Sequence, residues 1–230
     1  FFPEFWKMKS VNLIFLVILF AAKNLCGQKV KLAPNNLFAN KVYMSFERFH
    51  HKQAVKAIKD STVKEADEPT FIRLKSIDFR NGTIEVKVLS RLLPNASPSD
   101  RGFIGVAFRI NENNSQFECI YIRPTNGRAE EQVRRNHSIQ YFSFPDFKFS
   151  RLRKESPEMY ESYADMGLNE WIKLKIVVNG KQAKLFLNEN NQPSLIVNDL
   201  KLGNNASGAI GLFVDVGTEG YFSDLKINNQ

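Results

Sequence analysis

The sequence predicts an all-β fold of two packed antiparallel sheets, a jelly-roll sandwich. Three observations predict it: from residue 46 onward apolar and polar residues alternate over short segments, Gly, Asn and Pro bound those segments, and no long window has helical spacing. The chain has 230 residues, of which 43% are hydrophobic and 24% charged, as is typical of a folded globular protein. A sandwich of this length usually has one core, so we expect a single domain at residues 28–230.

The expected strands follow one another at short spacing. The first, at 53–58, lies in an ambiguous charged segment, where a helical turn is the alternative, and we place it at a sheet edge. The others are expected at 70–79, 82–92, 102–110, 116–124, 170–179, 182–188, 193–200, 208–215 and 220–227. Each has the length and the flanking turn residues of a strand, and together they suit two antiparallel sheets.

Two of these strands have the clearest alternation. In 82–92, Ile84, Val86 and Val88 alternate with charged residues, and 170–179 repeats the pattern. Apolar residues at every second position indicate a strand with one face in the core. The "NGK" at 179–181 then predicts a tight hairpin to 182–188, because Asn and Gly tolerate the positive φ of such turns.

The first 27 residues are expected to be an export signal. Met8 and Lys9 precede "VNLIFLVILFAA", a run of the length of a secretory signal core, and cleavage after Gly27 suits the small-residue rule. The residues before Met8 resemble translated upstream sequence. We therefore expect a secreted or periplasmic protein with no membrane span after signal removal. A lipid anchor on Cys26 is the minority alternative, because Leu25 is bulky for a lipoprotein signal.

The mature chain has one other cysteine and a moderate positive charge. Cys119 has no partner for an internal disulfide and is interpreted as a small core residue. Residues 1–27 contain three lysines and one glutamate, so that the net charge of +8 becomes about +6 for the mature domain. This charge suits an anionic polysaccharide or a nucleic acid, but no basic run is long enough to indicate an electrostatic stripe, so the charge alone decides little between partners.

Five stretches of the sequence, at 79–91, 101–110, 117–128, 169–188 and 208–227, carry a resemblance to a known fold family. They contain the strand opening "NGTIEV", the Gly-aromatic strand of "RGFIGVAFRI", the "W-K-V-NG" hairpin and the closing "YFSDLKI". The pattern resembles the concanavalin A-like lectin/glucanase superfamily, and within it the laminin-G-like branch close to the 3-keto-disaccharide hydrolase domain. The resemblance covers about residues 46–227. It implies a jelly roll whose concave sheet faces carbohydrate.

One catalytic motif of this superfamily is missing. Its family 16 glycosidases have a Glu-x-Asp-x-x-Glu motif on one strand, which places nucleophile and acid/base together over the sugar. Here Glu85 and Glu118 stand alone on their strands. A retaining glycosidase of that type is therefore not expected.

Strand alternation gives a candidate ligand-binding face. In 102–110, Ile104, Val106 and Phe108 are expected to face the core, which leaves small residues and Arg109 on the other side. In 116–124 the same logic places Tyr121 and Arg123 on a face opposite Glu118, Ile120 and Ile122. If the two strands are neighbours, Arg109, Tyr121 and Arg123 meet on an open face. The alternative is that they are ordinary half-exposed sheet residues.

The loop after this strand extends the candidate site. Pro124 and "NG" at 126–127 predict bends that turn Arg128 back toward the sheet, and Arg suits paired hydrogen bonds to carboxylates or vicinal hydroxyls. Asn126, Asn136 and Gln140 carry amides that pair with hydroxyls. The aromatic residues of 142–165 are either a sugar-stacking rim or a loop packed on the core.

Catalysis is the alternative function for the same segment. His137 and Tyr141 are the candidate acid/base residues, and Glu130, Glu131 and Asp146 are the nearest acids in sequence to orient His137. A lone histidine in a loop is more often structural, and no metal site is expected from the three histidines. No cofactor is expected; a structural calcium ion at "FVDVGTEG" or "PNASPSD" is the alternative.

The sequence therefore leads to three functional hypotheses. The first is an exported jelly roll that binds carbohydrate, including anionic polysaccharide, through Arg109, Tyr121, Arg123, Asn126, Arg128, Asn136 and Gln140. The second is a glycoside hydrolase or lyase on the same scaffold. The third is a laminin-G-like interaction module without a small ligand. Neither the glycan nor the oligomeric state follows from the sequence.

Overall fold

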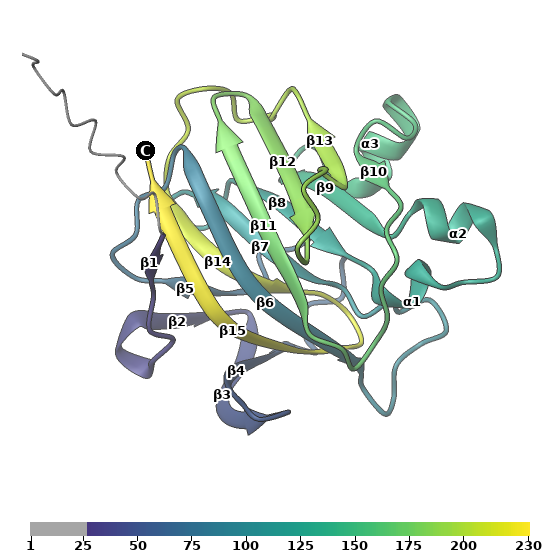
Figure 1. Cartoon of the computed structure of the whole chain (residues 1–230), viewed down its shortest axis with the longest axis horizontal. Helices are drawn as coiled ribbons and strands as arrows, with labels where there is room; N and C mark the ends of the chain where they lie inside the picture. Colours follow the sequence, from purple (N-terminus) through teal and green to yellow (C-terminus); the bar gives the residue numbers. More distant parts are fainter. Residues whose placement is uncertain (1–26) are drawn as a thin grey trace, which may run out of the picture.

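The computed structural model describes residues 27–230 and has the predicted all-β architecture, with two antiparallel sheets packed face to face (Figure 1). Most of the expected export signal, including Cys26, lies outside the described residues. In sheet A the path is β13 (Leu195–Val197), β12 (Gln182–Leu187), β11 (Ile172–Asn179), β6 (Gly82–Leu92), β15 (Thr218–Asn229), β4 (Lys52–Lys59) and β3 (Val42–Phe49), with β1 (Gln28–Lys29) also paired to β15. In sheet B it is β10 (Glu161–Ser162), β9 (Ile139–Phe144), β8 (Phe117–Ile122), β7 (Ile104–Ile110), β14 (Ala209–Val214), β5 (Phe71–Leu74) and β2 (Leu37–Asn40).

The short helices connect the strands at one side of the sandwich. They are α1 (Pro124–Gly127), α2 (Gln132–Asn136) and α3 (Phe149–Glu155), and a 3-10 turn spans Pro34–Asn36. Figure 1 shows the three helices gathered beyond β8 and β9, on the side away from the chain's C-terminus. No helix among residues 27–230 combines the length and the apolarity that a bilayer crossing requires.

Alternation in β6 and β11 is confirmed. Ile84, Val86 and Val88 are buried, and the neighbouring strand places Leu174 opposite Val86, so one side of both strands enters the core. The predicted hairpin is also confirmed: Asn179 pairs with Gln182, and Gly180 has φ +58. Local pattern and turn chemistry were sufficient here because both partners are adjacent in the chain.

The position of residues 53–58 differs from the expectation. They belong to β4, which lies between β3 and β15 and is therefore not an edge strand. The edge is β3, which begins before the region where alternation was evident. An edge strand and its neighbour can share the same alternation, so the pattern alone does not reveal how many partners a strand has.

Sheet B is buried on both of its sides. Every residue of β7, β8 and β14 is buried, although only one side packs on sheet A. The other side has an aromatic layer of Phe71, Phe117, Tyr121, Phe142 and Phe213. Residues 66–68 and the start of α3 lie over the polar end of this layer: the Phe149 amide donates to Asp67 Oδ2 at 2.7 Å, and Lys148 Nζ donates to Glu68 at 2.6 Å. The face that the sequence suggested to be open is therefore closed.

Candidate functional site

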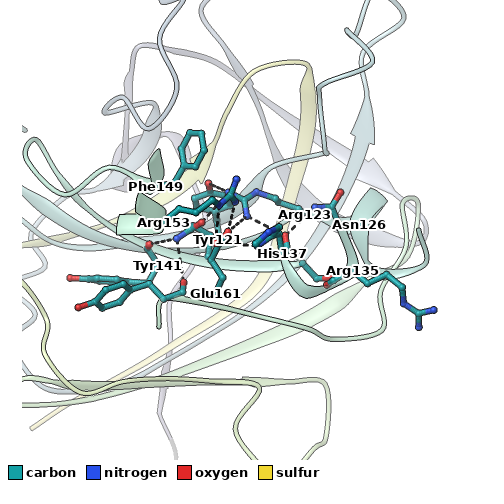
Figure 2. Close-up of polar contacts among 12 residues, drawn as sticks. Tyr121, Arg123, Asn126, Arg135, His137, Tyr141, Phe149, Arg153 and Glu161 are labelled. Carbon is teal, nitrogen blue, oxygen red and sulfur yellow. Dashed lines mark hydrogen bonds and ion pairs between the residues drawn. The ribbon is translucent and has the colours of Figure 1, made fainter. Parts of the chain in front are cut away.

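A buried network of charged and polar groups occupies the end of sheet B, around the carboxylate of Glu161 (Figure 2). Arg123, at the end of β8, donates to Glu161 Oε1 at 3.1 Å, and Arg153 from α3 donates through Nε to Oε2 at 2.9 Å. His137 Nδ1 lies 3.1 Å from Glu161 Oε2. The helix α2 ends at Asn136 and so places His137 at the entry to β9. Three cationic or imidazole groups thus converge on one carboxylate.

Hydrogen bonds and an aromatic ring hold the Arg123 side chain in place. Its guanidinium donates to Tyr121 Oη at 2.8 Å, to Gln140 Oε1 at 3.1 Å and to the His137 carbonyl at 3.1 Å. The Asn126 amide donates to that same carbonyl at 3.0 Å. The ring of Phe149 covers the guanidinium, with 5.6 Å between Arg123 Cζ and the ring centroid. Arg123 is therefore a rigid, desolvated cation.

The electrostatics of the network favour an ionised Glu161 and a neutral His137. Burial alone would raise the pKa of Glu161, but the hydrogen bonds from Arg153 and the charges of Arg123 and Arg153 lower it below the ordinary value. Burial lowers the pKa of His137, an effect that Glu161 opposes and the two arginines reinforce. At neutral pH the imidazole can therefore both donate and accept hydrogen bonds.

The network reaches the surface at a small hollow of 190 Å³. We call it the His137 hollow; it is lined by Asn136, His137, Glu158, Glu161, Ser162 and Tyr163. Tyr163 is 41% exposed, and Arg135 lies over its ring at 5.0 Å while donating to its hydroxyl at 2.8 Å. The hollow thus combines fixed polar groups with an exposed, oriented aromatic ring.

The structure brings five of the predicted site residues together. Tyr121, Arg123, Asn126, His137 and Gln140 share the network around Glu161. The expected open face is wrong for Tyr121 and Arg123, because both are buried beneath the cover of sheet B, and Gln140 is buried beside them. Only His137 of this group lines the hollow.

The expectation that Arg109 lies beside Tyr121 and Arg123 is wrong. Between β7 and β14 the pairing changes from Ala107 with Gly211 to Ile110 with Ala209, so β7 carries one extra residue, and Arg109 there has φ +54. This bulge breaks the alternation on which the expectation relied. Arg109 is buried at the far end of the strand and donates to the carbonyls of Arg80, Gly203 and Gly180, which ties three turns together.

Tyr141 also lies apart from the network. It is fully buried, donates to the Glu118 carboxylate and accepts from the Lys201 amide at 2.9 Å. Because side chains alternate along β9, Tyr141 points to the side of the strand opposite Gln140. It therefore shares no pocket with His137.

Arg128 and Asn136 are at the surface. The predicted bends form α1, after which Arg128 donates through Nε to Asp165 at 2.8 Å and through Nη2 to Glu170 at 3.2 Å. The expectation that Arg128 returns to the sheet mouth is therefore wrong, because two nearby carboxylates hold it outside. Asn136 lines the rim of the His137 hollow and accepts a hydrogen bond from Gln132.

Sequence reasoning missed the residues that complete the site. Glu161, not Glu130, Glu131 or Asp146, is the carboxylate beside His137. It lies on the two-residue strand β10, which is too short to give a periodic signal, and the "EMYESY" segment drew attention only to its aromatic residues. Of residues 142–165, Phe142 and Tyr160 pack in the core whereas Tyr163 reaches the surface.

Among residues 27–230, no three His, Cys, Asp or Glu side chains are grouped to hold a metal ion. In "FVDVGTEG" the Asp215 carboxylate accepts from Lys59 Nζ at 2.6 Å, so an ammonium group already neutralises it. In "PNASPSD" the Asp100 carboxylate accepts from the Ser97 amide at 2.7 Å. Both carboxylates named for calcium thus have internal partners.

Comparisons with known proteins establish the fold. No family model matches the sequence, and no curated protein matches it. The carbohydrate binding module CBM66 from Bacillus subtilis superposes with a TM-score of 0.53 at 13% identity, over 83% of this chain and 97% of that one. A Bacillus subtilis protein with a galectin-like fold gives 0.52 at 10% identity, over 85% and 90%. A provisionally assigned glycosyl hydrolase from Parabacteroides distasonis gives 0.52 at 13% identity, over 85% and 94%. The chain therefore shares the two-sheet jelly-roll sandwich fold of these structures.

Proposed function

We propose that this protein is an exported carbohydrate-binding domain, related to the laminin-G-like branch close to the 3-keto-disaccharide hydrolase domain, and that the His137 hollow receives the sugar. One observation carries the proposal: an exposed aromatic ring, Tyr163, stands beside hydrogen-bonding groups that a buried network holds fixed. The likeness to CBM66, a carbohydrate-binding module by name, supports the class of ligand.

The chemistry of the hollow suits a single sugar unit. A pyranose presents an apolar face, which packs on a tyrosine ring, and hydroxyls, which both donate and accept. Neutral His137, Ser162 and the Asn136 amide offer donors and acceptors, and Glu158 and Glu161 offer acceptors. Because Arg123 and Arg153 already hold Glu161, that carboxylate loses little conformational entropy when the sugar arrives.

Replacing Tyr163 with alanine is expected to weaken binding about tenfold while the fold is retained. The lost stacking contact corresponds to about 1–1.5 kcal/mol, and the exposed side chain contributes little to the core. A glycan array identifies a ligand, and titration calorimetry with that ligand measures the affinity of both proteins. The matched control is Met159→Ala, which truncates a side chain that is 62% exposed and does not line the hollow. Equal affinities for Tyr163→Ala and the native protein would place the sugar elsewhere.

The His137–Glu161 pair favours a second candidate function. His137 Nδ1 lies 3.1 Å from the ionised Glu161 carboxylate without a hydrogen bond to it, and a small rotation of the ring would give an oriented general base, which would make the protein a hydrolase or lyase. This hypothesis is confined to His137, because Tyr141 is buried on the other side of β9. A reducing-end assay on any array ligand decides it: product formation that His137→Gln abolishes supports catalysis, whereas binding without product leaves a binding domain. No binding to any glycan would favour an interaction module.

A further inference from the structure

The outer face of sheet A is hollowed along its length by three adjoining depressions. The first, of 510 Å³, lies under the segment that follows β1 and contains Lys29, Lys31, Lys52 and Asp224. The second, of 370 Å³, shares Lys29 and Asp224 with it and adds Lys87 and Lys173. The third, of 230 Å³, shares Glu85 and Lys226 with the second and adds Lys175. Because each depression shares lining residues with the next, we treat the three as one surface region and call it the lysine trough.

The register of the sheet sets the lysines in rows across the strands. Lys29 on β1 faces Lys226 on β15, Lys226 faces Glu85 on β6, and Glu85 faces Lys175 on β11. These four strands lie side by side at the front of Figure 1. Since neighbouring strands are about 4.8 Å apart, the row extends for roughly 14 Å. A second row places Lys87 directly opposite Lys173.

The trough contains more cations than carboxylates. Seven lysine side chains line it, against the carboxylates of Glu85, Glu189 and Asp224. Asp224 pairs with both Lys52 and Lys87, and Lys173 pairs with both Glu85 and Glu189. Within residues 27–230, no ion pair joins Lys29, Lys31, Lys175 or Lys226 to a carboxylate. These four lysines therefore have no direct ion-pair partner in the described part of the chain.

Two pairs of lysines lie directly opposite each other on neighbouring strands, and their repulsion lowers the stability of the fold. Like charges directly across a strand pair are destabilising, yet both Lys29–Lys226 and Lys87–Lys173 face each other. Lys87 and Lys173 each form ion pairs with a carboxylate, whereas Lys29 and Lys226 form none among the described residues, although Glu85 lies opposite Lys226. An anion between Lys29 and Lys226 would remove this repulsion, and the recess around them has the room for it.

We propose that the lysine trough binds a polysaccharide that carries spaced carboxylate or sulfate groups. The alternation of lysines with Glu85 and Asp224 favours this partner, because the carboxylates accept from hydroxyls while the lysines pair with the anionic substituents. A nucleic acid presents a continuous line of phosphates that these carboxylates would repel. An anionic bilayer would require a protruding surface, whereas the trough is recessed.

This surface is distinct from the His137 hollow. The trough lies on the outside of sheet A, and the hollow lies at the end of sheet B beside β10. The inference therefore does not depend on the proposed function. A polymer held in the trough would retain the protein on an acidic glycan surface while the hollow engages a single sugar unit.

The test compares two double variants with the same change in net charge. Lys29→Gln/Lys226→Gln removes the opposed pair, and Lys64→Gln/Lys154→Gln removes two exposed lysines outside the trough. Binding to dextran sulfate, polygalacturonate and uncharged dextran is measured at low salt by biolayer interferometry. We expect binding of at least one anionic polymer, about tenfold weaker in the first variant and unchanged in the second, with a shallower salt dependence in the first.

Three results would overturn the proposal. Equal weakening by the two double variants would mean that only net charge matters, and equal binding of uncharged dextran would mean that the lysines are not used. Tighter binding to single-stranded DNA or to anionic lipid vesicles, also lost in Lys29→Gln/Lys226→Gln, would assign the trough to a different polyanion. Thermal melts of both variants confirm that they fold. Tyr163→Ala is expected to bind the anionic polymer normally, so failure of this proposal and failure of the first are distinguishable.

Discussion

Replacing Glu161 with glutamine is expected to lower the free energy of unfolding by about 3–5 kcal/mol, because it leaves the buried cation Arg123 without a counter-charge. The Glu161 side chain is 3% exposed and that of Arg123 is 5% exposed, so solvent screens neither group. Glutamine keeps the size of the side chain, and the loss is therefore one of charge and not of packing. Urea denaturation at pH 7 measures the difference.

Glu155→Gln is the matched control for this prediction. Glu155 lies on α3 and pairs with Arg151 at 2.9 Å, but both side chains are about half exposed, so the change is expected to cost less than about 0.5 kcal/mol.

The acid dependence of stability provides a second measurement of the contribution of Glu161. Because the folded state lowers the pKa of Glu161, its contribution is present at neutral pH and is lost as the pH falls through that lowered pKa. Equal stability of Glu161→Gln and the native protein at pH 7 would refute a stabilising role for the ion pairs.

Replacing Asp67 with asparagine is expected to stabilise the protein at pH 8 and to have little effect near pH 4. Asp67 is fully buried, its Oδ1 has no hydrogen-bond partner among residues 27–230, and its backbone amide donates to Asp215 at 2.9 Å. Burial, and then the charge of Asp215, raise the pKa of Asp67 from 3.8 to about 7. The amide of Phe149 and the cations Arg123 and Lys148 only partly oppose this rise.

The direction of the pH dependence follows from proton linkage. A carboxyl whose pKa is higher in the folded state binds its proton more tightly there, so the free energy of unfolding falls as the pH rises from about 4 to about 7. A rise of this size corresponds to as much as about 4 kcal/mol at pH 8. Asparagine cannot ionise, and the stability difference between Asp67→Asn and the native protein should therefore grow over this pH range. Denaturation at half-unit pH steps measures it.

Asp146→Asn is the matched control for the pH series, because Asp146 is exposed on the segment that leads to α3. Its stability should follow that of the native protein at every pH. A constant difference between Asp67→Asn and the native protein from pH 4 to pH 8 would contradict the raised pKa. Asp67 accepts a hydrogen bond from the backbone amide of Phe149, the first residue of α3. The same series therefore also measures how much this contact between residues 66–68 and α3 contributes to the free energy of unfolding.

Local patterns predicted the features that depend on a few neighbouring residues, which are strand alternation and a tight turn. The alternation in 82–92 and 170–179 and the turn at Gly180 gave two core strands and a hairpin, and Cys119 was correctly interpreted as a buried residue. The candidate site was predicted less well. Tyr121, Arg123, Asn126, His137 and Gln140 do meet, but Glu161, the carboxylate that contacts both Arg123 and His137, was missed.

By itself, the sequence determined the fold class, the hairpin and the side of 82–92, 102–110 and 170–179 that faces the core, because side-chain alternation and turn residues act over a few positions. Only the tertiary structure decided which strands are neighbours, where β7 bulges at Arg109, and that residues 66–68 and α3 close the face of sheet B. These features depend on pairings between segments far apart in the chain. The lysine trough could not be predicted from the sequence for the same reason. Alternation places Lys87, Lys173 and Lys226 on outer faces, but only the pairing of distant strands brings them together.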